Sequence, residues 1–82
     1  MAVRLPWLDY LLIDIEKDSY LKKFYPFFKV VIEQARNKQI TAEQAAAQLQ
    51  AIVPSILSGT DKELYRITNL LEAVVSYTKK ID

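Results

Sequence analysis

Carboxylates are the side chains of this sequence that come closest to a catalytic arrangement. Asp14 and Asp18 stand four residues apart, a spacing that places two carboxyl groups on one side of a helix. The 82 residues include no His and no Cys, and Gly59 is the single glycine, so imidazole, thiolate and glycine-loop phosphate chemistry have no residues to act through. We interpret the pair as solvated charges near a helix end and expect no enzyme activity, catalytic residue, metal, cofactor or small-molecule substrate.

Three basic residues form a second arrangement that could bind a ligand. Lys22, Lys29 and Arg36 are spaced seven apart, so they share one ridge of a helix and could contact phosphates or an acidic partner. Residues 19–40 carry five basic side chains against one acidic, a balance of +4, whereas residues 1–18 carry a balance of −2. The net charge of the chain is +1, less than nucleic-acid-binding proteins usually carry. We favour a solvated face, partly neutralised by the acidic first helix.

A further nucleic-acid interpretation concerns the start of the last predicted helix. Tyr65, Arg66 and Asn69 are expected on its outer face, after a short link that contains Gly59, as in a helix-turn-helix. Arg and Asn side chains can bind guanine and adenine edges. The helix is, however, longer than most recognition helices, and two acidic residues in its first turn would face phosphates. Nucleic-acid binding through the ridge or through this helix is therefore the alternative function.

Aromatic residues near the N-terminus give the strongest indication of a binding surface. Leu8, Leu11, Leu12 and Ile15 form the apolar stripe of the first helix, and the other large apolar residues lie off that stripe. A terminal helix is hard to surround completely, and large aromatic side chains anchor protein interfaces. We therefore expect a partner or dimer surface on this helix, buried across a two-fold axis of a homodimer, made by Trp7, Tyr10, Ile13 and Asp14.

Four helical patterns must position these groups, near residues 6–17, 19–37, 41–58 and 60–80. The last is the clearest, because its apolar seam has spacings of 3, 4, 3, 4 and 3. Capping boxes are predicted at Thr41–Gln44 and Thr60–Glu63. Gly59 is expected to end the third helix in a left-handed conformation. The seam of the last helix consists of Leu64, Ile67, Leu71, Val74, Thr78 and Ile81.

Two prolines fall inside these helical patterns. The apolar phase continues unchanged through Pro26 and through Pro54, and both rings are expected on the polar side, so the sequence favours two helices that bend at proline. Two short helices hinged near Tyr25 are the alternative for the second segment. Phe24, Phe27 and Phe28 are all expected in the core of that segment.

Short connections between amphipathic helices favour antiparallel neighbours. The sequence thus predicts an all-α protein, a compact four-helix up-down bundle over residues 1–82 as one domain, with helices bent at Pro26 and Pro54. The apolar runs are too short to span a membrane, and no signal peptide is evident, so a cytoplasmic location is expected. The expected function is that of a non-enzymatic protein-protein interaction or regulatory protein.

Overall fold

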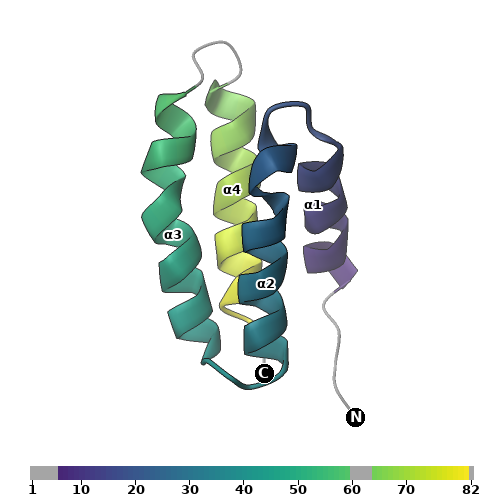
Figure 1. Cartoon of the computed structure of the whole chain (residues 1–82), viewed down its shortest axis with the longest axis vertical. Helices are drawn as coiled ribbons and strands as arrows, with labels where there is room; N and C mark the ends of the chain where they lie inside the picture. Colours follow the sequence, from purple (N-terminus) through teal and green to yellow (C-terminus); the bar gives the residue numbers. More distant parts are fainter. Residues whose placement is uncertain (1–5, 60–63, 82) are drawn as a thin grey trace.

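Helices make up the fold of this chain in a computed structural model that describes residues 6–59 and 64–81. These residues form four α-helices, α1 (Pro6–Lys17), α2 (Tyr25–Arg36), α3 (Ala42–Ser58) and α4 (Leu64–Thr78), and a short 3-10 helix, η1 (Leu21–Phe24). No strand occurs in the described part. Consecutive helices run in opposite directions, up and down (Figure 1). The predicted all-α up-down bundle is therefore confirmed.

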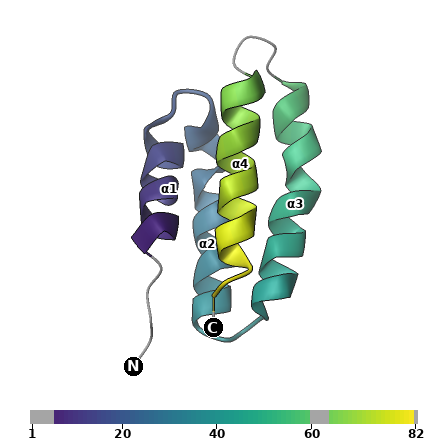
Figure 2. The ribbon, with the colours of Figure 1, turned by 180° about the vertical axis from the view of Figure 1, so that it is seen from behind.

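The four helices enclose one apolar core. α3 packs against α2 and α4, and α1 packs against the other sides of the same two helices, as both views of the ribbon show (Figures 1 and 2). In α4 the predicted seam is buried at Ile67, Leu71, Val74 and Thr78, and the Thr78 hydroxyl donates to the Val74 carbonyl at 2.7 Å. A buried hydroxyl is thus satisfied within its own helix. The other buried side chains include Leu8, Leu12, Ile15, Leu21, Phe28, Val31, Ile32, Ala35, Ala45, Ala46, Leu49, Val53 and Ile56.

Pro26 does not bend a continuous α-helix, so this prediction was wrong. The segment divides into η1 and α2, and α2 begins at Tyr25 with Pro26 in its first turn. The first N–H groups of a helix have no partner within it, so the missing N–H of Pro26 costs little there. The alternative of a break near Tyr25 is the one found. Pro54 does lie within α3 and is exposed, as expected, and its bend stays a prediction.

Helix ends follow local hydrogen bonding. The Thr41 hydroxyl accepts from the Gln44 backbone N–H at 3.0 Å, and the Gln44 side chain accepts from the Thr41 N–H at 2.9 Å, which confirms one capping box. The box predicted at Thr60–Glu63 lies outside the described residues.

At the end of α2, Lys38 adopts a left-handed conformation, φ 63°. The Gln39 and Lys38 N–H groups bond to the carbonyls of Gln34 and Ala35, a Schellman ending.

Replacing Lys38 with Gly should stabilise the fold. A side chain in the left-handed region is strained, whereas glycine is not, and the added backbone freedom of the unfolded chain offsets part of the gain. We expect the free energy of unfolding to rise by about 0.5–1 kcal/mol for Lys38→Gly. Urea denaturation measures it. The matched control is Gln39→Gly, where φ is not positive, and the same gain in the control would refute the assignment.

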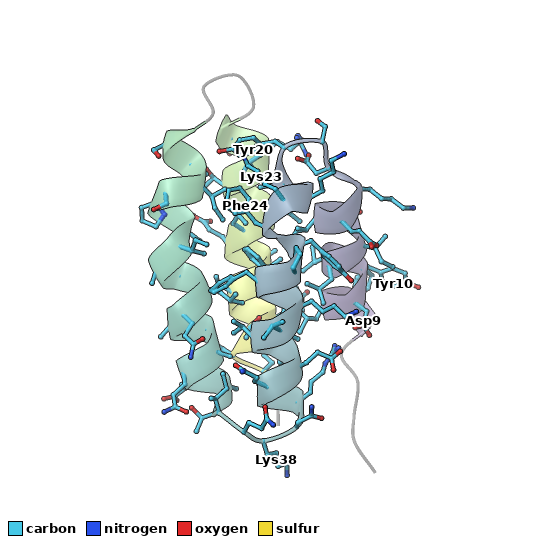
Figure 3. All side chains as sticks on the ribbon, in the orientation of Figure 1. Asp9, Tyr10, Tyr20, Lys23, Phe24 and Lys38 are labelled. Carbon is cyan, nitrogen blue, oxygen red and sulfur yellow. The ribbon has the colours of Figure 1, made fainter. Side chains whose placement is uncertain are left out.

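Glycine is needed at position 59 because a side chain has no room there, and not because the backbone conformation demands it. Its φ is −91°, so the predicted left-handed ending of α3 was wrong. The Tyr20 hydroxyl donates to the Ile56 carbonyl at 2.6 Å, next to Gly59, and this hydrogen bond joins residues 36 positions apart in the sequence. A Cβ atom on residue 59 would overlap that hydroxyl oxygen. The Tyr20 ring also packs edge-on against Phe24, with the Lys23 ammonium 4.8 Å from its centroid (Figure 3). Gly59 therefore leaves room for the bond that joins the start of η1 to the end of α3.

The effect of Gly59→Ala should depend on the residue at position 20. In the wild-type background the added methyl displaces the Tyr20 hydroxyl, and we expect a loss of about 1–2 kcal/mol in unfolding free energy. In the Tyr20→Phe background the obstacle is gone, and a less flexible unfolded chain makes Gly59→Ala neutral or stabilising by about 0.5 kcal/mol. Thermal or urea unfolding of the wild type, the two single variants and the double variant gives the coupling free energy between positions 20 and 59. Equal effects in both backgrounds would contradict this role of Gly59.

Candidate functional site: an aromatic surface on α1

Trp7, Tyr10 and Ile13 remain in solvent on the outer side of α1. They are 64%, 60% and 41% exposed, and the Trp7 and Tyr10 ring centroids lie 6.1 Å apart with the planes tilted by 57°. Tyr10 points away from the other helices (Figure 3). With the exposed Asp14 they form the surface that the sequence predicts, here called the α1 face. The structure therefore leaves these four side chains on one helix and accessible.

The α1 face is exposed because the opposite side of α1 supplies the core. Leu8, Leu12 and Ile15 recur at spacings of 4 and 3 and are buried, with Leu11 partly buried beside them, so the positions on the opposite side of the helix turn outward. On one flank Asp14 and Lys17, with Arg66 and Leu70 of α4, line a shallow hollow of about 400 Å³. This flank of α1 therefore borders α4, and its other flank borders α2.

An ion pair fixes the α2 flank of α1. The Arg36 guanidinium donates to the Asp9 carboxylate at 2.8 Å, with 19% and 35% of the two side chains exposed. Arg36 is one of the three cations of the predicted basic ridge, and it is engaged within the bundle. Lys22 and Lys29 are exposed and make no ion pair with any described residue. The acidic first helix thus neutralises one end of the ridge, as the sequence suggested.

Asp18 holds the corner between α1 and η1. One carboxylate oxygen accepts from the N–H groups of Tyr20 and Leu21 at 2.9 and 2.8 Å, and the other accepts from Arg66 at 2.7 Å. Its side chain is 8% exposed. Burial by itself raises the pKa of Asp18, but the hydrogen bonds from Leu21, Arg66 and Tyr20 together outweigh it and hold the pKa below its ordinary value of 3.8. The charged carboxylate is therefore the form that the fold stabilises.

The helix-turn-helix interpretation concerns Tyr65, Arg66 and Asn69, and all three are exposed on α4 within about one turn of each other. Tyr65 is 83% exposed, and Arg66 is bonded to Asp18. α3 and α4 run antiparallel and side by side (Figure 2), whereas the helices of a DNA-binding pair cross at a steep angle. Lys22 and Lys29 come from other elements, η1 and α2.

Two exposed apolar residues on α2 escaped the sequence analysis. Phe27 was expected in the core but is 38% exposed, and Val30 is 55% exposed. Phe27 lies at the edge of the apolar arc, and its ring meets Phe28 edge-on at 6.1 Å, so it covers the core from outside. Val30 lies opposite Phe28, Ile32 and Ala35 by helical spacing. The same periodicity could have identified it as a surface residue.

Neither a metal-binding cluster nor a membrane-spanning helix is found among the described residues. No group of three or more acidic side chains within residues 6–59 and 64–81 is arranged to hold a metal ion. No helix in these ranges combines the length and apolarity needed to cross a bilayer. What the surface offers chemically is a pair of aromatic rings, bordered by carboxylates and lysines.

Asp18 should make stability depend on pH in the acid range. Because its folded-state pKa is lowered, its contribution is complete above the ordinary value of 3.8 and is lost as the pH falls through the lower folded value. Asp18→Asn should be less stable than wild type at neutral pH, with a difference that shrinks on acidification. Urea denaturation across this range measures it, and Asp14→Asn, an exposed carboxylate of the same helix, is the control. A pH-independent difference for Asp18→Asn would contradict the assignment.

Comparisons with known proteins add no relative to this picture. Protein-family models, curated proteins and solved structures were compared with the chain, and none matches. The aromatic surface of α1 and the charges beside it are therefore the features from which a function can be inferred.

Proposed function

We propose that this protein is a small non-enzymatic interaction or regulatory protein of the cytoplasm, which self-associates as a homodimer through the α1 face. The supporting observation is the exposure of Trp7 and Tyr10, at 64% and 60%, on a helix whose other side already supplies core residues. Neither ring is needed to complete the bundle, and both are of the types that dominate interface energetics.

The energetics favour association that depends on concentration. Aromatic side chains bury roughly 150–250 Å² each, and each Å² of apolar surface removed from water contributes about 25 cal/mol. Covering the exposed parts of Trp7, Tyr10 and Ile13 therefore contributes several kcal/mol, within the range of about 4–15 kcal/mol that association costs. A modest dimer is the expected result, with flanking polar contacts deciding its strength.

The alternative of nucleic-acid binding has less support. Arg36 and Arg66 each have a carboxylate partner within the molecule, in Asp9 and Asp18. The two cations of the ridge that make no ion pair with described residues are lysines, Lys22 and Lys29. A mobility-shift assay with mixed DNA and RNA at low salt separates the two functions: binding that is lost on Lys22→Glu with Lys29→Glu would favour the alternative.

Self-association is tested by the mass of the protein in solution. Light scattering should give a mass above 9.5 kDa for the wild type as its concentration is raised. Trp7→Ala with Tyr10→Ala should return the mass to that of a monomer, because the variant loses most of the apolar area of the α1 face. Tyr65→Ala is the matched control, since it removes an 83% exposed tyrosine from α4; it should associate as the wild type does.

Two results would count against the proposal. A wild-type mass of 9.5 kDa at high micromolar concentration would exclude self-association and leave a different protein as the partner of the α1 face. A dimer that survives the double substitution would place the interface on another helix. Circular dichroism of each variant verifies that the helices remain folded.

A further inference from the structure

The exposed side of α1 continues beyond its aromatic pair as a single ridge. Trp7, Tyr10, Asp14 and Lys17 follow one another at spacings of 3, 4 and 3, so they lie along one side of the helix, and all four are exposed. We call these four residues the α1 ridge. Its first half is aromatic, and its second half carries one carboxylate and one ammonium group.

The side chains of the α1 ridge have no polar partner among the described residues. The ion pairs between described residues join Arg36 to Asp9 and Arg66 to Asp18, and so leave out both charges of the ridge. The hydrogen bonds between described side chains also leave out the ridge. The two aromatic rings contact each other, and no described cation lies over either of them. The ridge therefore offers four groups that a partner can satisfy.

The spacing of the α1 ridge is the same when it is followed in either direction. If two ridges meet antiparallel about a two-fold axis, each end of one ridge lies against the opposite end of the other. We infer that two copies associate in this way, with Trp7 facing Lys17 of the second copy and Tyr10 facing Asp14 of the second copy. This inference rests on the proposed self-association and names how the two surfaces meet.

Each facing pair joins groups that attract each other. An ammonium group over an indole ring makes a cation–π contact, and tryptophan is the best aromatic partner for it. A tyrosine hydroxyl that is withdrawn from water usually finds a hydrogen-bond partner, and a carboxylate is a strong acceptor. Two-fold symmetry forms each pair twice. The contact therefore covers the aromatic rings of both copies and gives each charge of the ridge a partner.

A parallel contact between two ridges lacks this complementarity. It would place Asp14 against Asp14 and Lys17 against Lys17, and like charges that face each other at an interface are unfavourable. The two arrangements thus predict opposite effects when a charge of the ridge is removed. Neutralising either residue weakens an antiparallel dimer and strengthens a parallel one.

Removal of the charges at exposed positions is the first test. Each pair occurs twice in the dimer, so we expect the dissociation constant to rise about tenfold for Lys17→Met and about tenfold for Asp14→Asn. Sedimentation equilibrium measures it. The matched controls are Lys29→Met on α2 and Glu16→Gln on the other side of α1, which make the same chemical changes at exposed positions outside the ridge. Both controls should associate as the wild type does.

Cysteine cross-linking tests the direction of the two helices, because the chain contains no Cys. In a mixture of Tyr10→Cys copies and Asp14→Cys copies, mild oxidation of the associated protein should give mainly the disulfide between positions 10 and 14. A parallel contact would instead join each variant mainly to its own kind, since the two positions are about 6 Å apart along the helix. Mass spectrometry of the digested product identifies the pairs.

The outcomes separate this inference from the function on which it rests. A wild type that stays monomeric overturns both. If the wild type associates and Trp7→Ala with Tyr10→Ala abolishes association, the proposed function stands. In that case, a neutralised variant that binds as tightly as the wild type or more tightly overturns only the inference, and so does a predominance of disulfides between identical positions. Weaker association of both neutralised variants, together with the 10-to-14 disulfide, supports it.

Discussion

The position of α1 depends on the carboxylate of Asp18. This one side chain, largely withdrawn from water, binds two N–H groups at the start of the next segment and the guanidinium of Arg66 on α4. A buried charge is tolerated only with such partners, so the three bonds define a single arrangement of the α1–η1 corner. Together with the Asp9–Arg36 pair, the corner holds α1 in the orientation in which its apolar stripe is buried. The candidate surface is the side of α1 opposite that stripe.

Much of the fold could be predicted from periodicity. The spacing of Ile67, Leu71 and Val74 places them in the core without any knowledge of their neighbours, and the Thr41–Gln44 box indicates a helix start through contacts within one turn. The exposure of Trp7 and Tyr10 follows from the same reasoning, because it needs only the phase of α1. Sequence patterns therefore suffice to predict those features whose contacts lie within one helix or one turn.

What the sequence did not reveal depends on contacts between distant segments. Gly59 resembles an ordinary helix ending, yet the atom that excludes a side chain there belongs to Tyr20. The basic ridge consists of three equivalent cations in the sequence, yet only pairing across two helices shows that Arg36 is bound. Pro26 looks like an interior residue because the apolar phase is unbroken, and a 3-10 helix preserves that phase well enough to conceal the break. Phe27 lies at the edge of the apolar arc of α2, where a small rotation of the helix decides whether its side chain is buried.

The isolation of Trp7 on the outside of α1 has a spectroscopic consequence. It is the only tryptophan of the chain, and its indole is mostly in water in the folded monomer. Its fluorescence therefore resembles that of an unfolded chain before any unfolding occurs, and emission would follow core disruption poorly. The same indole is well placed to report on whatever covers α1, since a shift of its emission to shorter wavelength would signal loss of water from that surface while the rest of the bundle stays unchanged.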